Sequence, residues 1–408
     1  MSRAGSSPIA QHLAASDSQM LRNSGREQIG VAVVGFGWMG RVHTQAYARV
    51  LHHFPQLALA PRLVAVADPE AGRLDEAVDQ YGFARAAASW QELAGDDTID
   101  AVSITAPNYL HREIATAMAR AGKHIWIEKP VGLDAADAQA VADEVMRTGV
   151  RSEVGFNYRN APAVEYAREL IEQGRIGTPT HARFRLLSDY AAHPQGALSW
   201  RFERERGGSG VLGDLVSHGV DLVRHLLGDI ESLVADTAVF IPQRPRATGA
   251  ISHFNTASGE LGPVENEDYA SCLLRLAGGA RVTLEASRVS VGEQCNYGFE
   301  IHGTRGALYW DFRRMGELGV CAGDGYQDQM TSTVFVGPGE GEFRAFQPGA
   351  GIALGFDDLK VIEAAQFLRS IADGKPHGAT IDDAVRSAHA LDAMVESARR
   401  GTWIEVPR

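Results

Sequence analysis

The chain has 408 residues, of which 45% are hydrophobic and 22% are charged, and its formal net charge is −12. This length exceeds what one hydrophobic core usually supports, so two domains are expected, with the composition of a globular protein. The acidic balance and the lack of a long Lys/Arg block argue against a nucleic-acid or anionic-membrane partner.

Cysteine usage and the N-terminal sequence indicate the compartment. The three cysteines, Cys272, Cys295 and Cys321, lack the spacing of a zinc site or a disulfide framework, so we expect no metal. Apolar runs fall short of the ~18–20 residues that span a membrane, and the start lacks the pattern of a signal peptide. We therefore expect a cytoplasmic protein. Residues 1–27, which show no clear periodicity, are expected to form a flexible arm.

From residue 28 the sequence alternates between apolar runs and helical stretches. The apolar runs are hydrophobic at nearly every position, which indicates strands buried on both faces of a parallel sheet. We expect strands at 29–34, 63–67, 101–105, 124–128 and 152–156. Helices are expected at 39–53, 70–81, 110–121 and 134–148. Repeated β-α-β units predict a doubly wound α/β domain of the Rossmann type over residues 28–153.

After residue 155 strands begin to follow one another without intervening helices. We expect strands at 180–187, 230–240, 268–276, 280–289, 297–302 and 307–312. Helices are expected at 161–173, 212–227, 357–374 and 381–399. This order predicts an antiparallel or mixed sheet in a C-terminal α+β domain over residues 154–408. Residues 241–266 are rich in Pro, Gly and polar side chains, and we expect a long loop there.

The motif G-F-G-W-M-G follows the first expected strand and opens the first expected helix. Gly35 would permit the tight turn, Gly37 would let the backbone approach a pyrophosphate, and Gly40 would let the helix pack on the strand. Phosphates bind well at such a helix N-terminus. The alternative is an ordinary strand-to-helix turn. The motif predicts a dinucleotide site formed by Gly35, Phe36, Gly37, Trp38, Met39 and Gly40.

Asp68 ends the second expected strand, in V-A-V-A-D. An acid at this position accepts hydrogen bonds from the adenosine ribose and repels a 2′-phosphate, so NAD is preferred over NADP. It comes later than the usual ~20 residues after the glycines, because the first helix and loop (41–62) are extended. Arg73 lies close enough to serve a phosphate, which keeps NADP open. Asp68 could instead cap a helix before Pro69.

Three further motifs carry side chains suited to acid–base chemistry. T-A-P-N-Y-L-H (105–111) and I-E-K-P (127–130) leave the carboxyl ends of two strands, the edge where open α/β sheets bind ligands. Lys129 at this edge could lend or accept a proton. In G-D-L-V-S-H, Asp214 and His218 are four residues apart on an expected helix and would share one face. Taken singly, each could equally be an ordinary surface group.

Together these motifs resemble those of the Gfo/Idh/MocA oxidoreductases. The resemblance extends from about Gln28 to the C-terminus and includes GFGWMG, APNYLH, IEKP, GFNYR, GSGVLGDLVSHGVDL and IHGTRGALYWD. It implies a Rossmann domain followed by a domain with a large open mixed sheet that often forms oligomer contacts, so a homodimer or homotetramer is expected. It also implies hydride transfer between NAD and a carbon of a sugar, glycoside or cyclitol.

The resemblance also implies roles for individual residues. Lys129, Asp214 and His218 would line the catalytic site, and Glu128 would lie near the nicotinamide ribose. The loop residues Pro107, Asn108 and His111 would border the cofactor. The stretches GFNYRNAPAV, GALSWRF and FIPQRP are most similar to levoglucosan-type and related glycoside 3-dehydrogenases within the family. This likeness would place near the sugar Tyr158, Arg159, Asp189, Trp200 and Arg201.

Hydride leaves a carbinol carbon only as its oxygen loses a proton, so a base must lie within ~3 Å of that hydroxyl. We expect a proton relay between Lys129 and His218, brought together from separate domains, with Asp214 orienting the imidazole or binding a neighbouring hydroxyl. The sequence leaves open which residue is the base. Two other readings stay open: a reductase of another carbonyl or imine, and a non-catalytic NAD-binding sensor.

Overall fold

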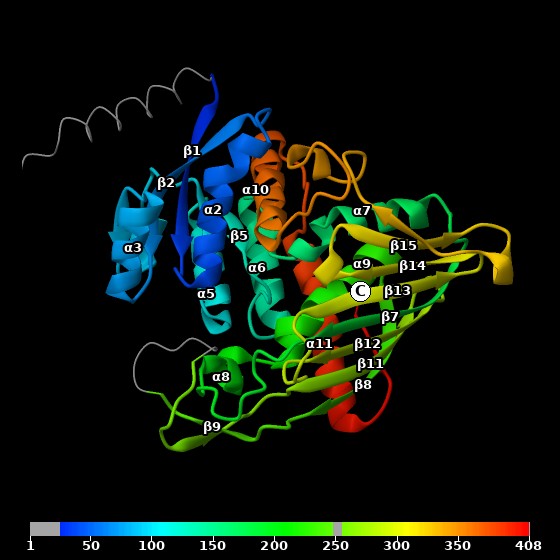
Figure 1. Cartoon of the computed structure of the whole chain (residues 1–408). Coiled ribbons are helices and arrows are strands. Elements are labelled where there is room, and N and C mark those ends of the chain that lie inside the picture. Colours follow the sequence, from blue (N-terminus) through cyan, green and yellow to red (C-terminus); the bar gives the residue numbers. More distant parts are fainter. Residues whose placement is uncertain (1–24, 248–254, 408) are drawn as a thin grey trace, which may run out of the picture.

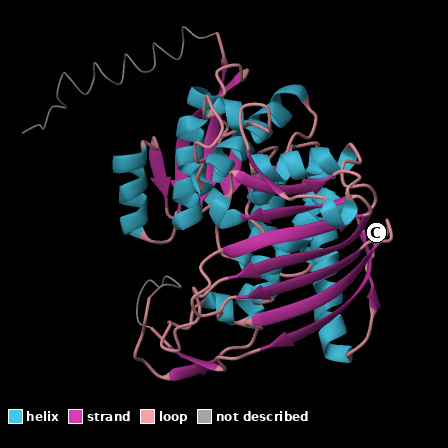
Figure 2. Ribbon diagram, turned by 45° about the vertical axis from the view of Figure 1, so that its right-hand side comes forward, coloured by secondary structure: helices cyan, strands magenta, loops and turns pink. Residues whose placement is uncertain are grey.

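The computed structural model describes residues 25–247 and 255–407 (Figure 1). Most of the expected arm at 1–27, and the middle of the expected loop at 241–266, lie outside these residues. Within them the chain forms two sheets with helices packed around them (Figures 1 and 2). None of the helices in these ranges is both long enough and apolar enough to cross a membrane.

The first sheet is parallel, six-stranded and ordered β3-β2-β1-β4-β5-β6. Its strands are β1 Glu27–Val34, β2 Leu59–Ala67, β3 Arg85–Ala87, β4 Ala101–Ile104, β5 His124–Ile127 and β6 Ser152–Val154. Around it lie α2 Trp38–His53, α3 Ala71–Tyr81, α4 Gln91–Ala94, α5 Asn108–Arg120 and α6 Ala135–Thr148. The doubly wound fold is confirmed. The details differ in that β3 and α4 were not expected and β2 begins four residues earlier than expected.

Local chemistry explains where helix α6 begins and ends. Asp134 precedes the helix in extended conformation, and its side chain accepts a hydrogen bond from the backbone N–H of Asp137. This satisfies one of the amide groups left free in the first turn. Gly149 ends the helix with a φ of 71°, a left-handed conformation that glycine adopts without steric cost.

The second sheet is mixed, nine-stranded and ordered β16-β15-β14-β13-β7-β12-β11-β8-β17. Its strands are β7 Pro179–Leu187, β8 Ile230–Ala238, β11 Tyr269–Leu276, β12 Arg281–Ser287, β13 Asn296–Gly303, β14 Gly306–Asp311, β15 Glu317–Ala322, β16 Ser332–Phe335 and β17 Ile404–Glu405. Only the pair β7–β12 is parallel among the described pairs of this sheet. The large mixed sheet is therefore confirmed, with β15, β16 and β17 added. The expected loop at 241–266 also holds two short paired strands, β9 Gln243–Pro245 and β10 Leu261–Pro263.

Helices line one face of this sheet (Figure 2). They are α7 Pro162–Glu172, α9 Ser217–Leu227 and α11 Ile381–Arg400. Helix α10 Phe356–Asp373 packs instead beside α2, and the short helix α8 Arg204–Gly207 lies near β9 (Figure 1). Single turns occur at η1 Asn157–Asn160, η2 Trp200–Phe202, η3 Leu212–Val216, η4 Phe312–Arg314, η5 Tyr326–Asp328 and η6 Phe343–Ala345. The helix expected at 212–227 is thus divided, because η3 has the wider π-helical hydrogen bonding.

Helix α10 connects the two halves of the molecule. It packs against α2 of the first half, beside the parallel sheet (Figure 1). Ten of its residues are buried, from Leu359 to Ser370, although its apolar positions do not follow a single stripe. A helix buried on most sides in this way is a core element. The carboxyl ends of β1, β4 and β5 thereby face elements from the second half.

Candidate active site

The three glycines of the first turn have three different surroundings. Gly35 has a φ of +89°, and a Cβ there would lie 2.7 Å from the backbone nitrogen of Ala106. At Gly40, a Cβ would lie 2.2 Å from the carbonyl oxygen of Gly35. A Cβ at Gly37 would instead meet open space. Helix α2 begins here without a side-chain cap, so its first N–H groups can bind an anion. A tight turn, a close helix contact and an open backbone cradle fit a dinucleotide pyrophosphate.

The side chains of this turn point in different directions. Phe36 is fully buried, and its ring packs edge-on against Tyr81, with centroids 5.2 Å apart. Trp38 is exposed and stacks on Phe356 at the start of α10, with centroids 5.4 Å apart. Met39 is half-buried. Phe36 can therefore contact a cofactor only through its backbone, and its ring anchors the turn.

Asp68 is buried and attached to the glycine turn. Its carboxylate accepts hydrogen bonds from the backbone N–H groups of Phe36, at 2.7 Å, and Glu70, at 2.9 Å. Arg73 Nη1 lies 3.3 Å from the same carboxylate. The acid thus braces the turn and the chain before α3, while it also neutralises the arginine that could have served a phosphate. Each carboxylate oxygen can accept a further hydrogen bond, so a ribose hydroxyl can still be bound.

Residues of the 105–111 loop connect neighbouring segments. Pro107 precedes α5, and the side-chain amide of Asn108 donates to the carbonyl of Gly207, at 3.2 Å. His111 is buried, with its ring nitrogens 2.8 Å and 2.7 Å from the carbonyls of Pro130 and Ala106. Nδ1 connects this loop to the E-K-P loop, and Nε2 contacts the loop's own backbone; that His111 borders the cofactor stays a prediction. Its imidazole therefore positions the loops.

Glu128 is buried, and one oxygen of its carboxylate has two partners. Its Oε1 lies 3.0 Å from His43 Nε2 and accepts a hydrogen bond from Lys360 at 2.6 Å. The carboxylate also rests against Gly155, where a Cβ would come within 2.6 Å of it. Burial would raise the pKa of Glu128, but the attraction of Lys360 and the His43 contact outweigh it, and the pKa is lowered. Glu128 is therefore ionised.

Lys129 and Asp214 meet directly. Lys129 Nζ donates to the backbone carbonyl of Asp214 at 2.8 Å and to its carboxylate at 3.3 Å. The other carboxylate oxygen accepts a hydrogen bond from the hydroxyl of Tyr190, at 2.5 Å. The lysine side chain is 13% exposed and that of Asp214 36% exposed, so the pair sits at a partly open surface. The carboxylate of Asp214, which lies in the π-helical turn η3, thus contacts both Lys129 and Tyr190.

His218 completes this group. It lies at the start of α9, and its ring packs against that of Tyr158 with centroids 4.4 Å apart. Burial, followed by the nearby charge of Lys129, lowers the pKa of His218 well below its usual value, while Glu128 and Asp214 oppose the shift. Its Nδ1 has no hydrogen-bond partner in the part of the chain that the structure describes. The imidazole is thus neutral at pH 7, beside a lysine and an aspartate.

Four of the five expected sugar-binding residues lie near this group or at its margin. Tyr158 is buried between His218 and Phe312, whose ring centroid is 5.0 Å away. Arg201 stacks on Trp200 at 4.3 Å. Burial raises the pKa of Tyr190, and the nearby charge of Arg201 opposes that shift, which places the guanidinium near the Asp214 partner. Asp189 precedes Tyr190, and its carboxylate accepts from the N–H of Gly292 at 3.4 Å.

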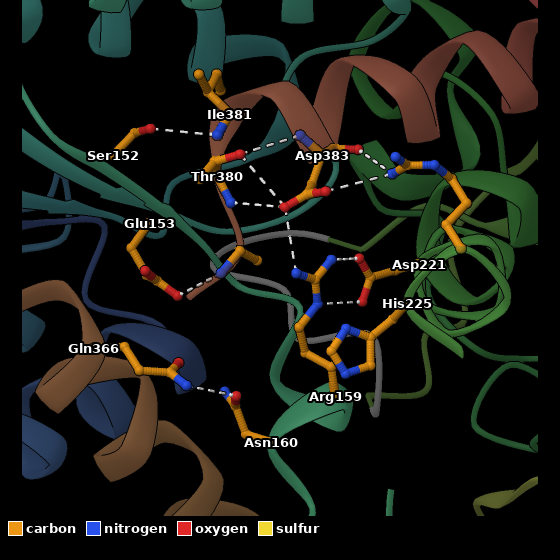
Figure 3. Close-up of polar contacts among 12 residues, drawn as sticks. Ser152, Glu153, Arg159, Asn160, Asp221, His225, Gln366, Thr380, Ile381 and Asp383 are labelled. Atoms are coloured by element: carbon orange, nitrogen blue, oxygen red, sulfur yellow. Dashed lines mark hydrogen bonds and ion pairs between the residues drawn. The ribbon is translucent and has the colours of Figure 1, made fainter. Parts of the chain in front are cut away.

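Arg159 is the exception, and the expectation that it binds sugar is corrected. Its guanidinium is buried and forms a two-point contact with Asp221 of α9 (Figure 3). A third contact, at 3.3 Å, reaches Asp383 in the first turn of α11. Paired in this way, the arginine joins η1 to two helices. Its role is to hold these elements together.

Sequence reasoning missed three residues that contact the expected ones. Tyr190 holds Asp214, and both His43 and Lys360 hold Glu128. Tyr190 directly follows Asp189, which was expected near the sugar, so the sequence indicated the neighbourhood of Tyr190 but not its hydrogen bond to Asp214. Nothing local marks Lys360, since with Glu363 it forms an i, i+3 pair that resembles an exposed helix surface.

Comparisons with known proteins agree with this geometry. Residues 29–156 match the family model described as "Oxidoreductase family, NAD-binding Rossmann fold", and residues 164–309 match the "GFO/IDH/MocA C-terminal domain". The chain is 36% identical to a levoglucosan dehydrogenase of Pseudarthrobacter phenanthrenivorans, over 94% of this chain and 99% of that protein. It is 30% identical to an inositol 2-dehydrogenase of Rhizobium meliloti, over 84% of this chain and 96% of that one.

Solved structures give the same answer. A levoglucosan dehydrogenase in complex with NADH and levoglucosan has a TM-score of 0.88 and 34% identity, over 94% of this chain and 100% of that chain. The match includes both the parallel sheet with its glycine cradle and the mixed sheet behind Lys129, Asp214 and His218. This chain therefore belongs to the Gfo/Idh/MocA family of NAD-binding oxidoreductases.

Proposed function

We propose that this protein is an NAD-dependent dehydrogenase that oxidises a secondary hydroxyl of a sugar, glycoside or cyclitol. The observation that carries the proposal is the contact of Lys129 with Asp214, at 2.8 Å, beside a neutral His218 at the carboxyl end of β5. The names of the relatives support the substrate class, since they include dehydrogenases of levoglucosan and of inositols. The likeness of the stretches GFNYRNAPAV, GALSWRF and FIPQRP of this chain to glycoside 3-dehydrogenases makes C3 of a pyranose the candidate carbon.

The cofactor residues proposed are Gly35, Phe36, Gly37, Trp38, Met39, Gly40, Asp68, Pro107, Asn108, Glu128 and Lys129. The open backbone at Gly37 supports a pyrophosphate there, and Asp68 paired with Arg73 supports NAD over NADP. When bound, the nicotinamide accepts a hydride from the carbinol carbon. The protein must bind the substrate hydroxyl, orient it and remove its proton.

The proton step is assigned to His218 and Lys129. A neutral imidazole accepts a proton, and His218 has an unpartnered ring nitrogen in the described part of the chain. An ammonium has three N–H groups, and Lys129 gives two contacts to Asp214, which leaves one N–H for the substrate oxygen. As negative charge develops on that oxygen, the lysine stabilises it. Asp214, which is held by Tyr190, fixes the lysine and can accept a hydrogen bond from a neighbouring hydroxyl of the substrate.

Sugar specificity is proposed for Tyr158, Asp189, Trp200 and Arg201. Aromatic rings pack on the apolar faces of a sugar ring, while a carboxylate and a guanidinium bind its hydroxyls.

We also propose a cytoplasmic homodimer or homotetramer. Helices line one face of the nine-stranded sheet, which leaves its other face for a second copy (Figure 2). Light scattering of the purified protein gives the oligomeric mass.

A panel of sugars, inositols and glycosides with NAD, followed by NADH absorbance, tests the proposal. At least one polyol should be oxidised, and NADP should support slower turnover. A parallel panel of ketones and imines with NADH tests the reductase alternative, which the relationship to a 1,5-anhydro-D-fructose reductase of Ensifer adhaerens favours. Turnover only in the second panel would replace the proposal with that alternative. NADH binding without turnover in either panel would favour the sensor.

A further inference from the structure

Lys360 is a buried cation that reaches the catalytic loop from a distant part of the chain. It lies on α10 with 1% of its side chain exposed, and it donates to Glu128 Oε1 at 2.6 Å. On its other side it forms an ion pair with Glu363 at 2.8 Å. Glu128 is the residue before Lys129, so Lys360 brings a charge from α10 to the loop that carries the proposed catalytic lysine. A buried charge this close to two acids is specific and costly to disrupt.

The second contact of Glu128 is with a neutral group. His43, on α2, is fully buried and stacks on Trp126 with ring centroids 3.7 Å apart. Burial lowers the pKa of His43 to about 4, against the opposing effect of the Glu128 contact. The neutral imidazole therefore donates its Nε2–H to the carboxylate and leaves Nδ1 without a partner in the described chain. Lys360 is consequently the cation that balances Glu128.

The remaining acid of this cluster is only partly ionised. Burial raises the pKa of Glu363 to about 7, although Lys360 opposes the shift. Burial would lower the pKa of Lys360, but Glu128 and Glu363 outweigh it, so the pKa is raised and the ammonium stays charged. At neutral pH the cluster thus holds one firm ion pair, that of Lys360 with Glu128.

Both charges of this ion pair act on His218, in opposite directions. The charged or titratable groups that act on the imidazole are Lys129 and Glu128 from the β5 loop, Lys360 from α10, Asp214 from η3 and Tyr158 from η1. Lys360 and Lys129 oppose protonation of the ring, and Glu128 and Asp214 favour it. A positive charge on α10 therefore contributes to the neutral state that a base requires.

We propose that Lys360 is a positioning residue: its ammonium fixes the Glu128 carboxylate against Gly155 beside Lys129, and its buried charge helps to keep His218 neutral. This inference rests on the proposed function, because it assigns Lys360 to the same site. It is separable from that function, since the orientation of Glu128 and the titration of His218 can be measured without turnover.

The test compares Lys360→Met with the wild type in the full-length protein. Nuclear magnetic resonance of ring-labelled histidine follows the titration of His218, assigned with His218→Asn, and NADH fluorescence follows cofactor binding. We expect the midpoint of His218 to move to higher pH and NADH binding to weaken roughly tenfold or more, the scale of a lost hydrogen bond to a charged group. Lys123→Met is the matched control.

Lys123 is also buried, and its ammonium donates to the backbone carbonyl of Asp96 at 2.8 Å. It precedes β5, whereas Glu128 follows that strand, so its loss should leave the His218 midpoint and NADH binding unchanged. Lys360→Met leaves the buried carboxylate of Glu128 without its cationic partner, which can impair folding. The same substitution in a Glu128→Gln background removes that carboxylate, and the midpoint should again rise relative to Glu128→Gln alone.

An unchanged His218 midpoint on loss of Lys360 in both backgrounds would overturn the inference, and so would an equal shift in Lys123→Met. These outcomes do not depend on substrate. If no polyol is oxidised but the midpoint moves as expected, the proposed function fails while the role of Lys360 in setting the site stands.

Discussion

The ammonium of Lys129 lies 2.8 Å from the backbone carbonyl of Asp214, although the two residues are 85 positions apart in the chain. The lysine follows β5 of the parallel sheet, and the aspartate lies in the turn that precedes α9 under the mixed sheet. A contact to a backbone oxygen fixes the lysine to the main chain of the second half, whatever rotamer the aspartate adopts. The catalytic distance is therefore set by the packing of the two halves.

Replacing Lys129 by Ala should lower kcat by roughly 10²–10⁴, the usual contribution of a positioned acid–base group. NADH binding should be reduced far less, because the proposed pyrophosphate contacts lie at the glycine turn. Steady-state kinetics on the best polyol of the panel, together with NADH fluorescence titration, measure both quantities. Lys123→Ala, which changes a buried lysine before β5, is the control. A kcat within twofold of the wild type would remove Lys129 from the mechanism.

The pH profile should report the neutral state of His218. Its pKa is lowered by burial, so the ring stays unprotonated in the folded protein below the usual ~6.5. The imidazole must be neutral to act as a base. We therefore expect kcat/KM to stay constant from neutral pH to below the usual histidine pKa, and to decrease as the pH falls through the lowered pKa of His218. His218→Asn should cut kcat by a similar factor to Lys129→Ala and abolish this acidic limb. An identical limb in the variant would assign it to another group.

The glycine turn offers a matched pair of substitutions. Gly40→Ala places a methyl group 2.2 Å from the carbonyl of Gly35, so the turn must shift and thermal stability should fall. Gly37→Ala meets no protein atom within 4 Å, so the fold should keep its melting temperature while NADH affinity weakens. Thermal denaturation and NADH titration separate the two effects. Full NADH affinity in Gly37→Ala would show that no ligand approaches that backbone.

Cofactor preference should depend on the pairing of Asp68 with Arg73. Asp68→Ala removes the carboxylate that repels a 2′-phosphate, and it frees a guanidinium that lies 3.3 Å from it in the native protein. The ratio of kcat/KM with NADP to that with NAD should rise at least tenfold. Asp68→Ala/Arg73→Ala should lose the gain in NADP use, since no cation then remains to bind the phosphate. An unchanged ratio in the single variant would contradict the assignment of Asp68.

The strands and long helices could be predicted because their signals are local. Nearly every position of 101–104 is apolar and buried, as a central parallel strand requires, and β11 and β12 pair across a short A-G-G-A turn, a common hairpin sequence. The strand β3, with the sequence R-A-A, carries no such signal. It becomes a strand because β2 offers a free edge for pairing, which is tertiary information.

The site was predictable where a motif is short and contiguous, and less so where distant segments decide the partner. Arg159 was expected at the sugar on the basis of its motif, but its guanidinium forms ion pairs with Asp221 and Asp383 of two helices (Figure 3). The spacing of Asp214 and His218 predicted one continuous helix, but a π-helical turn at 212–216 precedes α9, and the contacts of Asp214 with Lys129 and Tyr190 depend on distant segments. Lys360 resembled a solvated helix residue until the packing of α10 enclosed it.

The ion pair of Glu128 with Lys360 spans 232 residues. During synthesis the N-terminal sheet can form its strands early, but it lacks the helix that seals one side of α2 until most of the polypeptide has emerged. In that interval the acid before Lys129 has no cationic partner and apolar surface of α2 is uncovered, a state prone to aggregation. A chain that ends before residue 356 lacks α10, and we expect it to aggregate more readily than the full-length protein.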